Sequence, residues 1–351
     1  MSTPTTSKSV GETVSAHLAA PSTRGAPRLL KAVLGRPSIG MLVILLLLVA
    51  AFSALSPDAF LGIYNFRNIA LTASVIGVAA IGQTFVLATG GIDLSVGSVI
   101  VFATVISAKV MGRLGGLAGG GGAVAAGIAV CVAAGAFWGV INGLIVTRLR
   151  VPPLIATLGT LGMALGAAQL VSNGLDIRTV PTLMTNQIGY GNVAGIPVLV
   201  LVALVVAIIA GLVLWQTAYG LHTKSIGSNS EGALRSGIQV RRHLVSIYVI
   251  SGALAGLAGA MSLAQFSTTS IAGHTSDNLT TIAGAVLGGT SLFGGVATIF
   301  GTIIGILVPV TLQSGFVIVG IQPFWQTFAV GLVLVLAVFI DQLRRGTQHR
   351  Q

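Results

Sequence analysis

The chain has 351 residues, of which 54% are hydrophobic and only 7% are charged. Soluble domains carry roughly 25% charged residues, so this composition excludes a water-soluble globular protein and predicts helices packed in a lipid bilayer. The net charge of +11 would suggest a nucleic-acid partner in a soluble protein. Here we assign it to basic residues beside membrane spans, and we expect no nucleic-acid partner.

The first part of the chain, residues 1–39, is rich in Ser, Thr, Pro and Ala and contains five basic residues. This composition predicts a disordered cytoplasmic tail, because it offers too few apolar residues to form a core. Apolar sequence begins at Gly40, so we predict a transmembrane domain over 40–343. Residues 344–351 are expected to form a second cytoplasmic tail.

Ten apolar segments follow in chain order, and a helix needs roughly 17–25 such residues to cross a bilayer. They are 40–56, 68–89, 95–111, 124–147, 154–172, 198–217, 244–264, 281–292, 296–313 and 323–340. Segment 281–292 is too short to cross comfortably and is expected to form a half-helix or a re-entrant turn. The predicted fold class is therefore all-α, a polytopic membrane helical bundle with about ten transmembrane helices and glycine-rich helix breaks.

The distribution of basic residues predicts the orientation of this bundle. If all ten segments cross, both termini share one side, and four of the 18 Lys and Arg residues lie on the other side: Arg67, Lys109, Arg113 and Arg178. The remaining 14 lie on the side of the termini. Because cytoplasmic loops carry the excess of Lys and Arg, we predict that both termini are cytoplasmic.

Glycines recur four residues apart in several spans and so form smooth stripes on single helix faces. The sets are Gly135, Gly139 and Gly143; Gly162 and Gly166; Gly252 and Gly256; and Gly301 and Gly305. We expect each stripe to pack against another helix of the same bundle.

A glycine-rich break with a carboxylate follows the second span, in the stretch ATGGIDLSVGS at 88–98. Two hypotheses explain its residues Gly90, Gly91, Asp93, Ser95 and Gly97. In the structural one, the paired glycines end the helix, and Asp93 or Ser95 caps the next helix. In the functional one, Asp93 lines a translocation path or its cytoplasmic gate. The two hypotheses are compatible.

A second glycine-rich stretch predicts a similar break, with Gly288, Gly289, Thr290 and Ser291 as its central residues. Residues 288–304 align without gaps to 90–106, which is a weak internal repeat that chance similarity of apolar segments also explains. Repeated, interrupted helices are a common way to build a transport path in the membrane.

The polar segment 218–243 predicts a short helix at the cytoplasmic surface. Ser228 and Glu231 have the spacing of a capping box, and Gly237 is a suitable stop. Lys224, Arg235, Arg241 and Arg242 lie around this helix. The segment is either a docking surface for a partner or an ordinary basic cytoplasmic loop.

Several catalytic motifs are missing from the sequence. It contains no phosphate-binding G-x-x-x-x-G-K-[ST] loop, no H-E-x-x-H and no G-x-S-x-G. None of its five histidines has a partner at metal-ligand spacing. We therefore predict no catalytic residues, no metal, no cofactor and no enzymatic activity. A proton-coupled carrier would have only Asp93 as an acidic group within its spans.

Four stretches in this order resemble one known family: GGIDLSVGS at 90–98, PLIATLG at 153–159, SIGSNSEGALRSGIQV at 225–240 and AVLGGTSLFGG at 285–295. Together they are similar to the permease subunit of ABC importers for ribose, xylose and related monosaccharides. The similarity extends from about residue 40 to the end. It implies a permease in the bacterial inner membrane that acts with a second permease copy or paralogue, two cytoplasmic ATPase subunits and an external sugar-binding protein.

The resemblance also assigns the cytoplasmic segment a role, because its short helix matches the family loop that docks on the ATPase. The residues expected to couple to the ATPase are Gly227, Ser228, Asn229, Glu231, Ala233, Arg235 and Gly237. The binding protein is expected to dock on the outer loops 172–197 and 265–280.

The chain departs from the family pattern at two places, which leaves the sugar open. An acidic pair common before A-V-L-G-G is replaced by Asn278 and Thr280, and a basic residue common after TLG is replaced by Leu165. We therefore predict the permease subunit of an ATP-driven monosaccharide importer. The alternative is a stand-alone ion- or proton-coupled carrier of a small polar solute.

Overall fold

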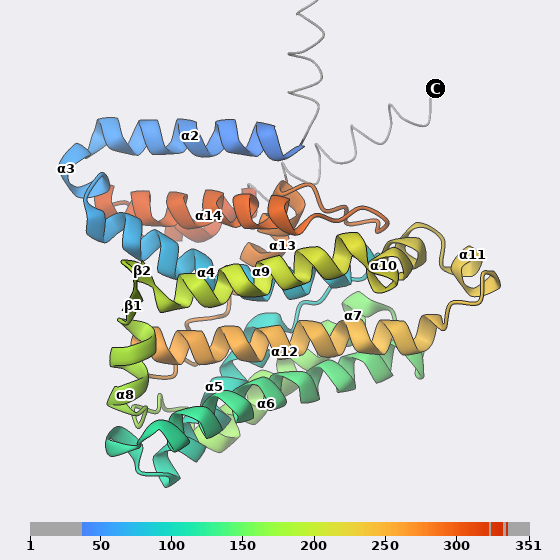
Figure 1. Cartoon of the computed structure of the whole chain (residues 1–351), viewed down its shortest axis with the longest axis horizontal. Helices are drawn as coiled ribbons and strands as arrows, with labels where there is room; N and C mark the ends of the chain where they lie inside the picture. The colour runs from blue at the N-terminus through green and yellow to red at the C-terminus, as the bar shows by residue number, and fades with distance from the viewer. Residues whose placement is uncertain (1–36, 323, 333–334, 336–351) are drawn as a thin grey trace, which may run out of the picture.

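The computed structural model describes residues 37–322, 324–332 and 335 (Figure 1). The predicted tail 344–351, and the predicted tail 1–39 except for its last three residues, lie outside the described residues. The described part is mostly helical, and its two strands are the two-residue pair β1 (Asn192–Val193) and β2 (Ile196–Pro197). The predicted all-α class is confirmed.

The helices follow each other in this order: α2 (Pro37–Leu55), α3 (Pro57–Phe60), α4 (Ile63–Ala88), α5 (Val96–Arg113), η1 (Gly116–Ala118), α6 (Gly121–Thr147), α7 (Pro153–Ser172), α8 (Thr182–Met184), the π-helical turn η2 (Thr185–Gly189), α9 (Val198–Gln216), α10 (Ala218–Ser228), α11 (Ser230–Arg235), α12 (Val240–Phe266), α13 (Asp277–Leu287) and α14 (Ile299–Val319). Residues 324–332 are also helical.

Seven of the described helices are long and apolar enough to cross a membrane: α4, α5, α6, α7, α9, α12 and α14. Residues Gly40–Leu55 of α2 form a shorter apolar helix. Helix α13 has 11 residues and spans about 16 Å, against the roughly 30 Å of a bilayer core. The predicted count of about ten spans is therefore not reached in the described part, and the predicted short piece is a half-length helix.

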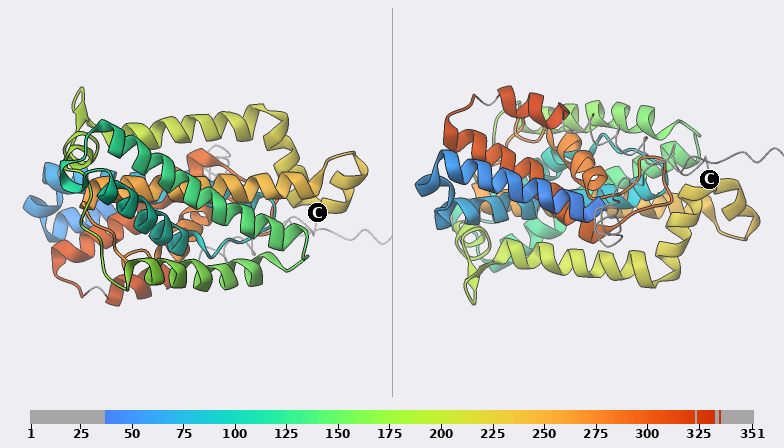
Figure 2. Two further views of the ribbon diagram at one scale, coloured as in Figure 1. Left: turned by 90° about the horizontal axis from the view of Figure 1, so that it is seen from below. Right: turned by 90° about the horizontal axis from the view of Figure 1, so that it is seen from above.

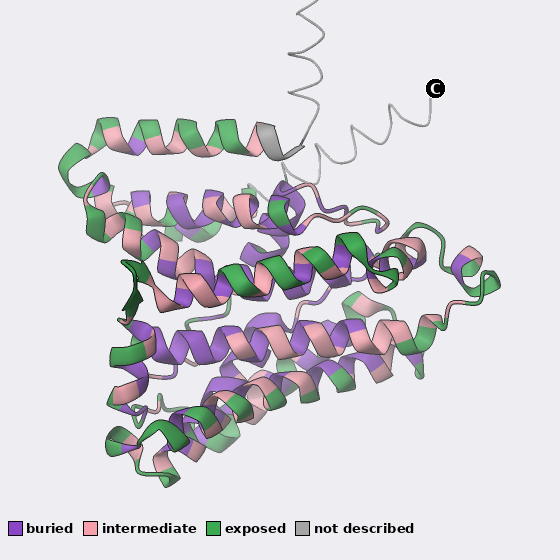
Figure 3. Ribbon diagram, in the orientation of Figure 1, coloured by how far each residue is buried: buried purple, intermediate pink, exposed green. Residues whose placement is uncertain are grey.

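Helix α4 is the most buried of the seven spans and α9 the least, and the side of α9 that Figure 3 presents has many exposed residues, whereas α12 is largely buried or intermediate. In its most apolar stretch α4 has 83% of its residues buried, whereas α9 has 22%. Helix α12 packs against α6, α4 and α5, so the segment after α11 is held on three sides. The exposed faces of α9 and α2 are rich in Leu, Val and Ile, as lipid contact requires.

The two ends of the bundle differ in their structure (Figures 1 and 2). Helices α10 and α11 project from one end, and α2 begins at that same end. The β1–β2 hairpin, α3 and α8 lie at the opposite end. Since the projecting helices belong to the polar segment 218–243, the predicted surface helix is located where a partner could reach it.

Close backbone contact between α6 and α12 confirms the prediction for two of the glycine stripes. A Cβ atom added to Gly135 would lie 2.1 Å from the Gly252 carbonyl oxygen. One added to Gly256 would lie 2.3 Å from the carbonyl oxygen of Cys131. Gly301 and Gly305 pack in the same way on α13. Only glycine permits such approach.

For Gly162 and Gly166 on α7 the prediction of packing within the bundle is wrong. No atom of the described residues lies within 4 Å of a Cβ added at either position. Spacing of four residues places glycines on one helix face, but it does not reveal what that face contacts. This face of α7 is open in the single chain.

The contact between α6 and α12 predicts opposite effects for one substitution at two sites. Gly139→Ala places a methyl group 2.2 Å from the Tyr248 carbonyl oxygen and should reduce stability by about 1–3 kcal/mol. Gly211→Ala on α9 has open space and should be neutral or gain up to about 1 kcal/mol. Thermal unfolding of the purified protein in detergent measures both, and equal effects would contradict the packing.

Candidate functional site

The first helix break separates α4 from α5 and includes residues 89–95. Gly90 has a left-handed backbone with φ of +78°, which ends α4 after Ala88. A Cβ on Gly91 would lie 3.0 Å from the Tyr248 Oη atom, so the chain passes close against α12. The prediction that these glycines end the helix is confirmed.

Side chains from two neighbouring helices satisfy the peptide groups of this break. The amide of Gln83 on α4, in the orientation that satisfies both partners, donates to the Asp93 carbonyl and accepts from the Asp93 N–H, each at 3.2 Å. The hydroxyl of Thr157 on α7 accepts from the N–H of Leu94 at 3.1 Å. Buried peptide groups need such partners because lipid provides none.

Asp93 is 3% exposed and belongs to a chain of hydrogen bonds that joins four elements. Its Oδ1 accepts from the N–H of Ser95 at 2.9 Å and from the Ser95 hydroxyl at 2.6 Å. Its Oδ2 accepts from the Ser251 hydroxyl of α12 at 3.4 Å. Asn142 of α6 donates to Ser95 at 2.8 Å and accepts from Thr160 of α7 at 2.6 Å.

The predicted cap of α5 is only partly right. Ser95 is the N-cap residue, but its side chain makes no capping bond, and Asp93 accepts from Ser95 rather than from the helix. The N–H of Gly97 donates instead to the Asn278 Oδ1 of α13 at 3.0 Å. A side chain 181 positions later thus satisfies the first turn of α5, and local spacing contains no signal for it.

The second break, residues 288–298, connects α13 to α14. Gly289 has φ of +95°, and Thr290 and Ser291 are 1% and 3% exposed. A Cβ on Gly288 would lie 2.2 Å from the Gly301 carbonyl carbon, so the break folds back on α14. In the proposed repeat Gly294 is equivalent to Val96, where α5 begins, but α14 begins only at Ile299. The two breaks therefore begin at nearly equivalent positions of the repeat, but the second break is longer than the first.

The two breaks meet each other and the end of α10 in what we term the glycine junction: Gly90, Gly227, Gly294 and Gly295. The N–H of Gly295 donates to the Ala88 carbonyl at 3.0 Å. A Cβ on Gly227 would lie 1.9 Å from that same oxygen and 2.6 Å from the Gly295 nitrogen. Sequence reasoning selected Gly90 and Gly227 from separate motifs, and the structure brings them together with two glycines that it missed.

The short helix α11 is capped by a different residue from the one predicted. Ser228 is the last residue of α10, and Asn229 is the N-cap of α11, where its Oδ1 accepts from the Gly232 N–H at 2.8 Å. Glu231 pairs instead with Arg235 at 2.6 Å. The predicted capping box is therefore wrong, because the helix begins one residue later and Asn229 occupies the cap position. The predicted stop is confirmed, since Gly237 has φ of +86°.

Helix α10 is fixed to α12 by two side-chain contacts. The Tyr219 hydroxyl lies 2.7 Å from the Ser246 hydroxyl, and the Thr223 hydroxyl lies 2.8 Å from the His243 Nε2 atom. Burial raises the pKa of the Tyr219 phenol, so this group stays protonated at neutral pH. Within α11, Ala233 is buried and Leu234 is 61% exposed.

The two loops predicted at the outer surface are hydrogen-bonded to each other. The N–H of Thr269 donates to the Ile177 carbonyl at 3.0 Å, and the N–H of Ile271 donates to Asp176 Oδ1 at 3.0 Å. His274 Nδ1 lies 2.7 Å from Asp277 Oδ2. No group of three or more His, Cys, Asp or Glu that could hold a metal occurs among the described residues.

A small pocket between α5, α7 and α13 includes two of the three residues at which the sequence is expected to depart from the family pattern. Leu165 and Asn278 line it together with Gly97, Ser98 and His274. Two residues 113 positions apart in sequence therefore line one pocket.

Comparison with known proteins identifies relatives over most of the chain. Residues 65–338 match the profile of the family described as branched-chain amino acid transport system permease component. The ribose import permease protein of Bacillus subtilis (strain 168) is 37% identical, covering 87% of this chain and 92% of that protein. An L-arabinose ABC transporter permease protein of Azospirillum brasilense is 33% identical, covering 88% and 89%. The D-allose transport system permease protein of Escherichia coli (strain K12) is 34% identical, covering 87% and 91%. No solved structure significantly matches the chain.

The Asp93 network predicts that an amide can replace this carboxylate but an alkyl group cannot. Asp93→Asn keeps an oxygen for the N–H of Ser95, so stability should change by less than about 1 kcal/mol. Asp93→Leu leaves that buried N–H without a partner and should cost about 1–3 kcal/mol. Thermal unfolding in detergent distinguishes them. If Asn is as destabilising as Leu, the charge itself holds the break.

Proposed function

The chain belongs to the family of permease components of branched-chain amino acid transport systems, among the sugar ABC permeases, and on this premise we propose that it forms the membrane subunit of an ATP-driven monosaccharide importer. The observation that supports the proposal best is the glycine junction, because it joins the projecting segment α10–α11 directly to both helix breaks. A partner that moves α11 would therefore move the interrupted helices.

The ATPase partner is proposed to dock on α11. A separate ATPase is needed because the sequence of this chain contains no phosphate-binding loop. Charge supports a cytoplasmic location for this end of the bundle. Among the described residues, six basic side chains lie at the α11 end: Arg148, Arg150, Lys224, Arg235, Arg241 and Arg242. Four lie at the hairpin end: Arg67, Lys109, Arg113 and Arg178. Both termini are then cytoplasmic, in the bacterial inner membrane.

Transport is proposed to proceed by alternating access. Closure of the ATPase pair pushes α11, and α10 transmits the displacement through Gly227 to Ala88 and Gly295. The contacts of Gly227 with Ala88 and Gly295 are between backbone atoms, so no side chain can change rotamer to absorb a displacement. A shift of Gly227 therefore requires both breaks to shift. The sugar-binding protein docks at the other end, on the paired loops 172–197 and 265–280. ATP hydrolysis takes place in the partner, so this subunit has no catalytic residues.

A second permease copy is proposed to cover the open face of α7. Gly159, Gly162 and Gly166 have no atom of the described residues within 4 Å of an added Cβ, and small residues favour close approach of membrane helices. The pocket formed by Leu165 and Asn278 opens beside this face. The path for the sugar then runs between the two copies.

The alternative, a proton-coupled carrier acting alone, finds little support in the site. Asp93, the acidic candidate within the first break, already accepts three hydrogen bonds from Ser95 and Ser251. A proton relay needs a group that exchanges partners with solvent or solute. Asp93 instead holds the break in place.

Reconstitution in liposomes tests the proposed function. The chain, its ATPase subunits and the external binding protein should accumulate D-ribose, L-arabinose or D-allose only when ATP is supplied on the ATPase side. Accumulation by the chain alone under a proton gradient, without ATP, would sink the importer proposal and favour the carrier.

The docking role of α11 predicts a strong effect at its exposed apolar residue. Leu234→Asp should reduce ATPase co-purification at least tenfold, because it places a charge where the partner is expected to bury Leu234, which is 61% exposed in the single chain. Leu117→Asp is the matched control, since Leu117 is 57% exposed at the opposite end. Membrane insertion should be normal for both. Equal co-purification of the two variants would place the ATPase elsewhere.

A further inference from the structure

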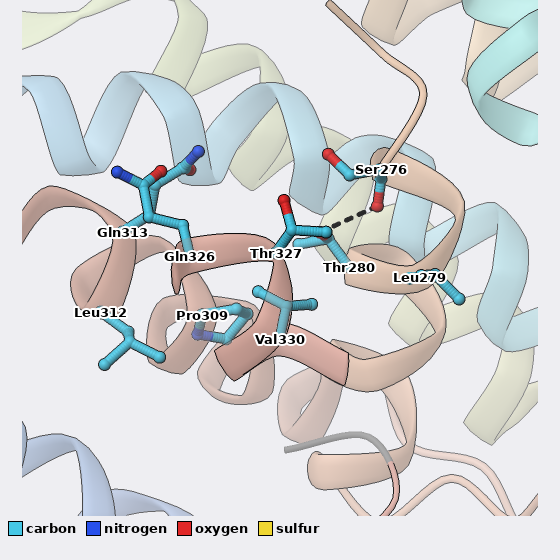
Figure 4. A pocket seen from close by; sticks show the side chains of 9 residues that line it. All are labelled: Ser276, Leu279, Thr280, Pro309, Leu312, Gln313, Gln326, Thr327 and Val330. Carbon is cyan, nitrogen blue, oxygen red and sulfur yellow. Dashed lines mark hydrogen bonds between the residues drawn. The ribbon is translucent and has the colours of Figure 1, made fainter. Parts of the chain in front are cut away.

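A polar pocket lies between the first turn of α13, the middle of α14 and the helical segment 324–332 (Figure 4). We term it the amide pocket and define it by its polar lining: Ser276, Thr280, Gln313, Gln326 and Thr327. Gln313 lies 14 residues into α14, or about 21 Å along that helix. The α14 side of the pocket is thus at membrane depth, while Ser276 and Thr280 come from the end of segment 265–280.

The two glutamine amides that line this pocket have no hydrogen-bond partner among the described residues; Gln326 is 8% exposed, and Gln313 is exposed in the single chain. Each amide has two N–H donors and an oxygen that accepts two bonds. Thr280, by contrast, donates to the Ser276 carbonyl at 3.1 Å. A polar group without a partner is costly in hydrocarbon, so these amides indicate a partner that the single chain does not provide.

The lining of the pocket indicates the chemistry of that partner. No charged side chain is found among the described residues that line it, which disfavours an ion or a phosphate. Leu312 and Val330 add apolar walls beside the amides and hydroxyls. A sugar has the matching surface, since its hydroxyls both donate and accept while its ring carbons form apolar faces. Carboxamides can bind two neighbouring hydroxyls at once.

We propose that the amide pocket is a contact site for the transported solute within the membrane, and that this solute is an uncharged polyhydroxyl compound of monosaccharide size. The inference rests on the proposed importer function. Gln313 and Gln326 bind the solute's hydroxyls, and Thr327 and Ser276 add hydroxyl groups to the same lining. Without charge the contact is weak enough for the solute to leave again.

Cysteine accessibility tests whether the pocket faces water. The one native cysteine, Cys131, is buried and can be replaced by Ser. In the assembled transporter, Gln313→Cys and Gln326→Cys should react with a membrane-impermeant methanethiosulfonate, because thiolates form only in water. The control is Leu204→Cys on α9, which is 53% exposed and, like Gln313, six residues from the hairpin end of its helix. This control should be inert. If both pocket variants are as inert as the control variant, the pocket is no solute site.

Transport measurements test the contact itself. Gln326→Met keeps the shape but removes the amide, and should lower uptake two- to tenfold at limiting concentration of whichever sugar the unsubstituted transporter takes up fastest among D-ribose, L-arabinose and D-allose. ATPase activity stimulated by the binding protein should stay within twofold. Gln216→Met, at the exposed end of α9, is the control and should transport normally.

Three results would overturn the inference while leaving the importer function intact. Unchanged uptake by Gln326→Met excludes a solute contact. A parallel fall of uptake and ATPase activity shows that the amide holds the assembly together. Oxidative cross-linking of Gln313→Cys between two copies shows that the partner is the second permease. Failure of the proposed function is distinct, because the unsubstituted transporter would then show no ATP-dependent uptake.

Discussion

The requirement that every peptide group inside a membrane be hydrogen-bonded determines most of this structure. Two helices are interrupted within the bundle, and each interruption leaves N–H and carbonyl groups without helical partners. Gln83, Thr157 and Asn278 supply the missing partners of the first break from three different helices. These three buried polar side chains therefore have a structural role. Their hydrogen bonds fix how α4, α7 and α13 pack around the break.

The same requirement explains how the projecting segment α10–α11 contacts the interior. A break exposes backbone rather than side chains, and backbone can be approached closely only by glycine. Gly227 of α10 contacts the Ala88 carbonyl oxygen, which already accepts from the N–H of Gly295. Three chain segments thus share one carbonyl group. A displacement of α10 cannot be absorbed by rotation of a side chain, so the helix ends on both sides of the junction must respond.

Sequence predicted the features that local patterns encode and missed those that depend on packing. Seven of the ten predicted spans match membrane-length helices to within about six residues at each end, because apolar length is a local property, whereas 323–340 lies partly outside the described residues. Gly90 was recognised because its left-handed turn is local too. The capping of Gly97 by Asn278 joins positions 181 apart, which no spacing reveals. The face of Gly162 was misjudged for the same reason. Asn229 displaced Ser228 as a cap because neighbouring residues competed for one turn.

The buried carboxylate in the first break is fully hydrogen-bonded, whereas the side chains with free hydrogen-bonding groups in the amide pocket are uncharged. This difference is relevant to transport. Asp93, the acid within the break, has both oxygens engaged by Ser95 and Ser251. The neutral amides of Gln313 and Gln326, by contrast, make no hydrogen bond to the described residues. A carboxylate facing the path would bind cations or hold a sugar through charge-assisted bonds about twice as strong as neutral ones. Solute release would then be slow. With the carboxylate committed to the scaffold, a path of amides and hydroxyls can bind a neutral sugar and still let it go.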